Sequence, residues 1–371
     1  PNYFFCYCTK FLLIDGTIFP MNYTNSPIQQ VTFNTQKYFI KRDDLLNSNF
    51  SGNKARKFYY YLINDFPNIK KVVSFGSSQS NAMYSLSVLC KLKNWQFDYY
   101  VDHTASFLKE NPVGNYKYAI KNGMNIIESK LPDFFDKETL FINEGGALSQ
   151  AAYGIEVLAN EIKLWVNQNN IKDIKVFLPS GTGTTALFLQ KYLPFEVLTC
   201  ACVGNDEYLK KQFEELEKNN HPTIVKMEKK YHFGKLYKEF YEIHNQLLKQ
   251  TNIEFDLLYD SLGWICFEKY ISSLKNKEKN YIFLYVHQGG IIGNFSMIER
   301  YKHKYSPVFS KIFIFVIEYK YSRASLNLRT NESRNNLVTF ALFCIGCSSS
   351  FNPFIFIQFT ESGLISDVLK Y

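Results

Sequence analysis

The chain is poor in histidine and has no long hydrophobic run. Its 371 residues include 6 histidines, and His103, His232 and His287 are scattered, with no further ligand at a spacing that suits a metal. The longest apolar runs, such as residues 336–347, are shorter than the ~20 residues of a membrane-spanning helix. We therefore expect a soluble protein without a metal site and without a membrane partner.

Cysteine is present, but the 8 cysteines form no framework. Cys90, Cys200 and Cys202 lie in apolar runs, so we predict buried thiols. Cys344 and Cys347 make a single CxxC motif without a second pair or a nearby histidine, which is a weak indication of zinc. Free thiols are typical of a reducing compartment, so the expected location is cytoplasmic.

The first residues lack the pattern of a signal peptide. Residues 1–20 do not start with methionine, and their apolar run is broken by Lys10, Asp15 and Gly16. A signal peptide has a basic start and a cleaner apolar stretch. We expect residues 1–20 to be a leader outside the folded part, either a flexible extension or an error of gene modelling.

The overall composition is that of a globular protein. Hydrophobic residues make up 46% and aromatic residues 17%, which is enough for a packed core. The length indicates two domains or one large one. The net charge of +8 is modest, and the lysines mix with acids, as in residues 210–218. A solvated basic surface explains this charge, and a basic, aromatic-rich nucleic-acid binder is the alternative from another class.

Short apolar segments alternate with helical patterns over most of the chain. This alternation predicts an α/β fold with parallel sheets covered by helices. We expect strands over 71–75, 97–101, 124–128, 175–178, 195–203 and 281–286, and helices over 81–93, 112–122 and 185–192. The pair Gly145-Gly146 lies between two such series and indicates a domain junction. Beyond residue 305 the apolar patches follow no period, and we expect an appended segment there rather than a third small domain.

A pair of lysines lies where an extended run gives way to a helix. Lys54 follows Gly52 and Asn53, and Lys57 comes three residues later, on the same helical face. In the first helical turn, the positive end of the helix dipole favours the neutral amine of Lys54. Such an amine is suited to a Schiff base. A capped surface helix with a solvated basic face is the ordinary alternative.

Three other segments contain residues that are suited to binding or catalysis. A loop of glycine and threonine follows the strand predicted at 175–178. Its backbone amides and the N-terminus of the next helix would bind a phosphate. An ordinary strand-to-helix loop has the same pattern and is the alternative. Its residues are Gly181, Thr182, Gly183, Thr184 and Thr185, and they depart from both the GxGxxG and Walker patterns, which argues against dinucleotides and nucleoside triphosphates. Hydroxyls and amides crowd another helix start at residues 76–81, where simple capping by Ser80 or Asn81 is the alternative. The third segment is Tyr259-Asp260, in which the tyrosine could equally be a buried aromatic.

Read together, these segments resemble a known family in order and spacing. The runs are KRDDLL, SGNKARKFYYYL, SFGSSQSNAMYSLSVL, VFLPSGTGTTALFL, DLLYDSLGW and HQGG. They are similar to those of the pyridoxal-phosphate enzymes of the 1-aminocyclopropane-1-carboxylate deaminase and D-cysteine desulfhydrase family. The resemblance covers residues 22–305 approximately. It implies fold type II, the fold of the tryptophan synthase β subunit.

The resemblance also implies a role for each segment. Lys54 would bind pyridoxal 5'-phosphate as a Schiff base and shuttle protons, and residues 181–185 would hold the cofactor phosphate with Lys57 nearby. Asn81 would bind the phenolic oxygen of the cofactor, while Ser80, with Ser78, Gln79 and the neighbouring amides, would hold the substrate carboxylate. Tyr259 would lie over the substrate as acid, base or attacking group. Asp260 would face the pyridine nitrogen and make the ring a stronger electron sink.

Two positions depart from the deaminase pattern. Phe233 stands where those enzymes have a second active-site tyrosine, and Gln288 stands where they have a leucine. We therefore predict D-cysteine desulfhydration, which gives an α-keto acid, ammonia and sulfide, and weaker or absent deamination of 1-aminocyclopropane-1-carboxylate. A catalytically silent relative that binds the cofactor is a further alternative.

The resemblance divides the chain into parts. Residues 21–57 and 146–305 would form a large cofactor-binding domain, and residues 58–145 a small inserted domain, with the cofactor between them. The tail, residues 306–371, has no counterpart in the family, and whether it belongs to the native protein is open, as it is for the leader. The expected partners are a small amino-acid substrate and a second copy of the chain in a homodimer, with no nucleic acid.

Overall fold

The computed structural model describes residues 23–47, 49–50, 52–274 and 281–305, and the backbone of five short strands nearer the two ends. The chain divides into two compact units, residues 1–307 and 308–371. Cys6, Cys8, Cys344 and Cys347 lie outside the described residues. Five strands are described by backbone alone: the antiparallel pair β1 (Phe11–Ile14) and β2 (Thr17–Pro20) in the first unit, and in the second unit an antiparallel sheet of β13 (Val338–Ala341), β14 (Phe356–Thr360) and β15 (Gly363–Leu364).

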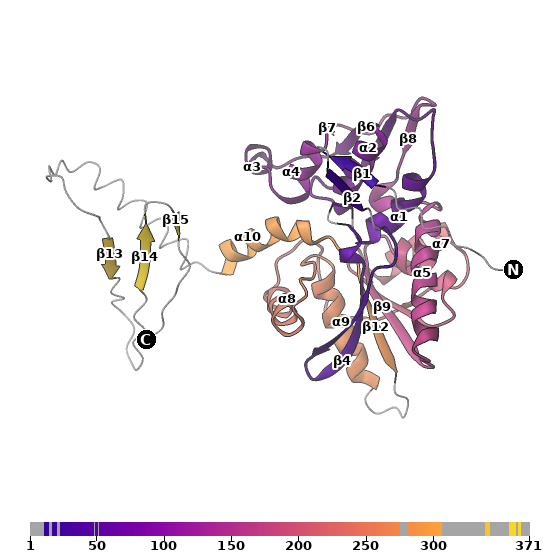
Figure 1. Ribbon diagram of the computed structural model, residues 1–371, viewed down its shortest axis with the longest axis vertical. Coiled ribbons are helices and arrows are strands. Elements are labelled where there is room, and N and C mark those ends of the chain that lie inside the picture. The colour runs from indigo at the N-terminus through magenta and orange to yellow at the C-terminus, as the bar shows by residue number, and fades with distance from the viewer. Residues whose placement is uncertain are drawn as a thin grey trace. The chain divides into compact units, whose positions relative to one another are not determined.

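The first unit contains a six-stranded sheet (Figure 1). Its strand order is β11-β10-β9-β12-β4-β3, and every neighbouring pair is parallel except β3 and β4. The exception has a local cause. Asn34 and Thr35 both have positive φ, the conformation of a two-residue hairpin turn, which brings the chain straight back on itself. The bounds are β3 (Ile28–Phe33), β4 (Gln36–Arg42), β9 (Ile174–Ser180), β10 (Val197–Ala201), β11 (Thr223–Ile224) and β12 (Ile282–His287).

Helices cover both faces of this sheet, and the strand residues alternate between them. Phe283 and Tyr285 of β12 pack in one core cluster with helices α8 and α9, whereas Leu284 and Val286 pack in another with α5 and α6. Because successive side chains of a strand point to opposite faces, a sheet covered on both sides needs such a continuous apolar run. Figure 1 shows α5 and α8 on opposite sides of β4, β9 and β12. The bounds are α5 (Ala151–Gln168), α6 (Thr184–Tyr192), α8 (Lys238–Thr251) and α9 (Asp260–Leu274).

A four-stranded sheet with the order β7-β6-β5-β8 lies in the same unit, and all its pairs are parallel. Its strands fall between residues 58 and 145. The proposed division into a large and a small inserted domain stays a prediction, because both sheets belong to the unit of residues 1–307. The bounds are β5 (Lys71–Phe75), β6 (Gln96–Val101), β7 (Met124–Glu128) and β8 (Thr139–Phe141), with helices α2 (Asn81–Lys93), α3 (Ser106–Glu110) and α4 (Gly114–Lys121).

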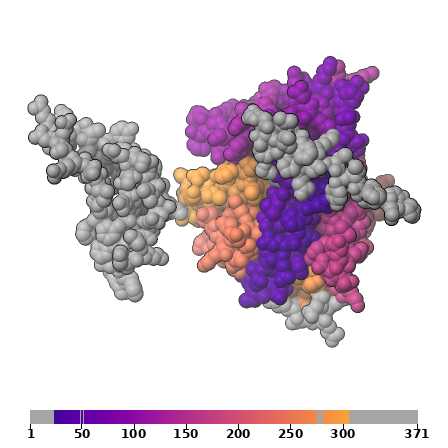
Figure 2. All heavy atoms as spheres, in the orientation of Figure 1, coloured from indigo at the N-terminus to yellow at the C-terminus, as the bar shows by residue number. Residues whose placement is uncertain are grey.

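The remaining elements connect and flank these sheets. They are α1 (Gly52–Ile63), α7 (Asp206–Leu216) and α10 (Asn294–Tyr305), and the 3-10 turns η1 (Asp43–Leu45), η2 (Glu144–Gly146) and η3 (Ile291–Gly293). Figure 2 shows the indigo residues, the first part of the described chain, exposed on one face between the magenta residues of α5 and the salmon residues of α8. Within the described ranges, no helix has both the length and the apolar character to cross a bilayer.

The sequence-based expectations agree with this architecture in its main lines. The α/β fold with parallel sheets is confirmed, and β5, α2 and β7 have the predicted bounds. Cys90, Cys200 and Cys202 are buried free thiols, as predicted, and Cys266 is a fourth. The antiparallel strand β3 was not predicted, and neither were β8 and helices α7 to α10.

Candidate active site

The first turn of α1 is fixed to the carboxyl end of β12. The backbone N–H of Asn53 donates to the carbonyl of Gln288 at 3.0 Å, and the Asn53 side-chain amide donates to Gln288 Oε1, also at 3.0 Å. Gly52 has φ +65°, and a Cβ there would lie 1.8 Å from the Gln288 carbonyl oxygen. Only glycine allows this close approach. The side chain of Gln288 also donates to the carbonyl of Pro179 at 2.6 Å, so the residue predicted to contact substrate has its polar atoms engaged by the protein.

The opposite face of α1 is held by buried charges. Arg56 donates to Asp43 at 2.8 Å and to Glu161 at 2.7 Å, and Lys41 donates to Glu161 at 2.6 Å. Arg56 and Asp43 are each 1% exposed, so removing one partner of the network would leave an uncompensated buried charge. Two residues along a helix differ by about 200° in direction. The network therefore fixes the rotation of α1 with Lys54 turned away from it.

The amines of Lys54 and Lys57 converge on one oxygen atom. Each donates to the carbonyl of Gly145, at 3.0 Å in both cases. Burial lowers the pKa of Lys54 to about 8, while the carboxylate of Glu144 partly opposes this shift. Burial, and then the charge of Lys54, lower the pKa of Lys57 well below the usual range. The sequence predicted a neutral Lys54 amine from the helix dipole, but the structure gives burial as the main cause.

The loop between β9 and α6 places threonine hydroxyls next to these amines. Lys57 donates to Thr182 Oγ1 at 3.4 Å, and the hydroxyls of Thr182 and Thr184 are 3.1 Å apart. Gly183, the residue before α6, has φ +71°, and a Cβ there would lie 2.4 Å from the ring of Phe213. The hydroxyl of Thr185 is buried and has no hydrogen-bond partner among the described residues. A buried orphan hydroxyl, two threonines, a helix N-terminus and a lysine amine together fit a phosphate ester.

The loop that ends β5 leads into α2 and lies near this site. Ser80 caps α2, accepting from the backbone N–H groups of Ala82 at 3.1 Å and Met83 at 3.4 Å. Capping was the alternative interpretation of this serine. Burial raises the pKa of Tyr99, and a hydrogen bond between the Ser80 hydroxyl and Tyr99 partly opposes this shift. Ser78 is half-buried and Gln79 is exposed on the same loop.

Asn81 is positioned by a residue that sequence reasoning missed. Asn115 of α4 donates to Asn81 Oδ1 at 2.6 Å and to the carbonyl of Gln79 at 3.0 Å. The turn after β12 also lies against this side chain, because a Cβ on Gly290 would be 2.5 Å from Asn81 Nδ2. A lone asparagine in a helix gives no sequence signal of such a role.

Tyr259 lies against the glycine and threonine loop. A Cβ on Gly181 would be 3.1 Å from Tyr259 Cε1. The ring of Phe233, which is 44% exposed, lies 5.1 Å from the ring of Tyr259. Burial, and then the charge of Asp256, raise the pKa of the Tyr259 phenol, so the hydroxyl keeps its proton at neutral pH.

Asp260 begins α9 and is buried, with a donor on each carboxylate oxygen. Tyr285 donates to its Oδ1 at 2.7 Å, and the backbone N–H of Asp256 donates to its Oδ2 at 3.1 Å. Burial and the neighbouring charge of Asp256 raise the pKa of Asp260 well above the usual range. The assignment of Asp260 to a pyridine nitrogen stays a prediction, because its present partners are protein groups.

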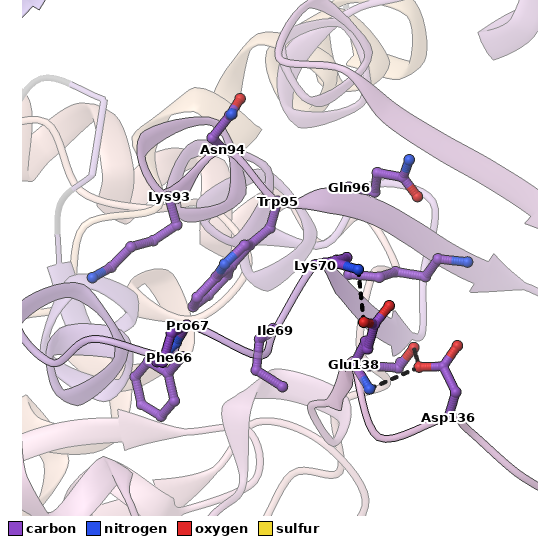
Figure 3. Close-up of a pocket in the computed structure, with 12 residues that line it drawn as sticks. Phe66, Pro67, Ile69, Lys70, Lys93, Asn94, Trp95, Gln96, Asp136 and Glu138 are labelled. Atoms are coloured by element: carbon purple, nitrogen blue, oxygen red, sulfur yellow. Dashed lines mark hydrogen bonds and ion pairs between the residues drawn. The ribbon is translucent and has the colours of Figure 1, made fainter.

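A cavity of about 510 Å³ lies elsewhere on the four-stranded sheet (Figure 3). It is lined by the first residues of β5, β6 and β8, whereas Ser80 and Asn81 follow the carboxyl end of β5. The cavity and the candidate site are therefore at opposite edges of this sheet. None of the predicted site residues lines it; the lining residues are Phe66, Pro67, Ile69, Lys70, Lys71, Lys93, Asn94, Trp95, Gln96, Asp136, Glu138 and Thr139.

The histidines considered above as possible metal ligands have other surroundings. His287 Nε2 lies 2.8 Å from the Glu254 carbonyl, and its ring stacks on Phe255. His103 Nδ1 lies 3.8 Å from Glu128 Oε2, and His232 directly precedes Phe233. Within the described residues, no group of three or more His, Cys, Asp or Glu side chains is placed to hold a metal ion.

The fold can be compared with those of known proteins. The two mainly parallel sheets give the described part of the chain the fold of pyridoxal-phosphate-dependent enzymes of fold type II. No family model matches the chain. It is 25% identical, over 74% of its length and 96% of the relative, to a protein from Thermotoga maritima named "Putative 1-aminocyclopropane-1-carboxylate deaminase".

Solved structures agree on the fold. An ACC deaminase homologue matches with a TM-score of 0.59 and 20% identity, covering 76% of this chain and 94% of that one. A threonine deaminase from T.th. matches with a TM-score of 0.51 and 11% identity, covering 72% of this chain and 92% of that one. The resemblance read from the sequence motifs is confirmed by these similarities.

Proposed function

We propose that this chain binds pyridoxal 5'-phosphate and acts as a lyase or deaminase on a small amino acid. One observation carries the proposal: the Lys54 and Lys57 amines meet at the Gly145 carbonyl, beside a loop whose buried Thr185 hydroxyl lacks a partner among the described residues. Two charged amines that share one acceptor repel each other, and after burial the charge of Lys54 is the second cause that lowers the pKa of Lys57. An anion at this loop would relieve that repulsion.

The chain's residues fit the cofactor group by group. Residues 181–185 and Lys57 would hold its phosphate, Lys54 would bind it covalently, Asn81 would donate to its phenolic oxygen, and Asp260 would face its ring nitrogen. When bound, the cofactor withdraws electrons from the α-carbon of the amino acid.

The proton chemistry follows from the amines and hydroxyls. With a pKa of about 8, the Lys54 amine is partly neutral near neutral pH and can take the α-proton at Nζ. Tyr259 keeps its proton, because burial raises its pKa, and can donate to a leaving group. Ser80 and the N–H groups of its loop would bind the substrate carboxylate.

The substrate proposal favours D-cysteine over 1-aminocyclopropane-1-carboxylate. Loss of a thiol needs only removal of the α-proton and a good leaving group, whereas opening the cyclopropane ring also needs a placed acid and nucleophile. Phe233, which contacts the Tyr259 ring, supplies no second hydroxyl. We expect a higher kcat/KM for D-cysteine in parallel assays of keto acid and sulfide, and a higher value for the cyclopropane substrate would overturn this choice.

Visible absorbance tests the cofactor itself. The purified protein with added pyridoxal 5'-phosphate should become yellow, and its absorbance should shift when D-cysteine or D-serine is added. A colourless protein that binds nucleic acid through Lys54 and Lys57 would contradict the proposal. Visible absorbance without release of keto acid from any amino acid would indicate a catalytically silent relative.

Assembly as a homodimer and a cytoplasmic location belong to the same proposal. Sedimentation would test the homodimer.

A further inference from the structure

The carboxylate of Glu144 lies at the carboxyl edge of the four-stranded sheet. A Cβ on Gly76, the residue after β5, would be 2.9 Å from Glu144 Oε1 and 2.8 Å from the hydroxyl of Tyr99. Gly76 begins the loop that contains Ser80. In the described part of the chain, no hydrogen bond or ion pair engages the Glu144 side chain, which is exposed. Its carboxylate oxygens can therefore accept hydrogen bonds from a ligand.

The field of this carboxylate reaches the groups of the candidate site. Its charge raises the pKa of Lys54, of Tyr259 and of Tyr99, three residues on three different segments. Because a Coulomb interaction weakens with distance and with solvent, one acid that acts on all three lies among them. The backbone of the next residue, Gly145, is the acceptor of both lysine amines. Glu144 therefore borders the place where the substrate would bind.

We propose that Glu144 accepts a hydrogen bond from the β-substituent of the substrate. The chain would then select small amino acids whose β-substituent is a donor, namely a thiol, a hydroxyl or an ammonium group. This inference rests on the proposed function and makes its substrate class more specific. Ionised carboxylates only accept hydrogen bonds, and those bonds are strongest with charged donors. The ring methylenes of 1-aminocyclopropane-1-carboxylate offer no donor.

A charge at this point also discriminates among the donors. An ammonium group adds an ion pair to the hydrogen bond, so 2,3-diaminopropionate should gain most from Glu144. An acidic β-substituent, as in aspartate, would be repelled. Glu144 acts here as an acceptor, and no proton transfer is assigned to it.

The first experiment compares substrates that differ in the β-donor. D-2,3-diaminopropionate has a donor, whereas β-chloro-D-alanine has a good leaving group and none. We expect Glu144→Gln to lower kcat/KM for D-2,3-diaminopropionate by about 10- to 100-fold, the range of a lost hydrogen bond to a charged group. The same substitution should change kcat/KM for β-chloro-D-alanine by less than about threefold.

A second readout needs no cofactor and no turnover. In the protein without added cofactor, reductive methylation of Lys54 with labelled formaldehyde can be followed against pH. The midpoint should lie near the pKa of about 8 in the wild type. Since the Glu144 carboxylate raises this pKa, Glu144→Gln should move the midpoint to lower pH. An unchanged midpoint would show that Glu144 does not act on Lys54, and would overturn the inference.

Glu138→Gln is the matched control. Glu138 is also an exposed glutamate, but it pairs with Lys70 at the other edge of the same sheet. It should leave the selectivity and the Lys54 midpoint unchanged. If both substrates respond equally to Glu144→Gln, the inference fails while the proposed function stands. If the wild type binds no cofactor and processes neither substrate, the proposed function fails and the inference fails with it.

Discussion

Gln288 and Asn53 are joined by two hydrogen bonds of 3.0 Å, one between backbone groups and one between side-chain amides. The two residues are 235 positions apart in the chain. Their contact fixes the first turn of α1 to the end of β12, and with it the position of Lys54. Where the deaminase pattern has leucine, this chain has a side chain that can tie helix and strand together.

Replacement of Lys54 by alanine should abolish covalent cofactor attachment while leaving the fold intact, because among the described residues the Lys54 amine makes one hydrogen bond, to a backbone carbonyl. Borohydride reduction of the wild type followed by peptide mapping should label Lys54. Lys57→Ala is the control: it should weaken cofactor binding and still leave the label on Lys54. A label on another lysine would sink the assignment.

Replacement of Gly183 by alanine should damage both stability and cofactor binding. Alanine in the left-handed region costs roughly 1–2 kcal/mol, and the new methyl group would also meet Phe213 and Leu209. Gly123→Ala shares the positive φ, but nothing lies within 4 Å of its Cβ. We therefore expect thermal unfolding to report a loss in both variants, and cofactor titration to report a loss in Gly183→Ala alone. Equal cofactor affinity in the two variants would place the phosphate elsewhere.

Replacement of Asp260 by asparagine should lower the rate if this carboxylate faces the ring nitrogen. Loss of such an electrostatic partner costs about 2.7 to 4 kcal/mol of barrier, roughly a hundredfold to a thousandfold in kcat. Asp256→Asn is the control, since Asp256 is buried nearby and one of its oxygens has no partner among the described residues. An Asp260→Asn enzyme within a factor of about three of wild type would assign the ring nitrogen to another group.

A protein of residues 21–305 should fold, bind the cofactor and turn over substrate like the full chain. The division of the chain after residue 307 is the structural reason, because the candidate site lies wholly in the first unit. Circular dichroism, cofactor absorbance and kcat/KM would be compared for the two lengths. Aggregation of the shorter protein, or loss of its cofactor, would show that residues beyond 305 pack against the core.

The sequence by itself determined the alternation of strands and helices, the glycine and threonine loop and the lysine pair, because these depend on local periodicity and on residues close together in the chain. It did not reveal β3, because a hairpin turn of Asn34 and Thr35 lacks the glycine that marks most such turns.

Only the tertiary structure decided which groups meet. The fold brings Glu144 close to Gly76, which follows β5, and to Tyr99 of β6. It also brings Asn115 into a hydrogen bond with Asn81, 34 residues away. The same holds for the pKa of Lys54, which burial lowers more than its place in the helix would suggest. Burial and Coulomb interactions depend on distances in space, and no local pattern of residue types contains those distances.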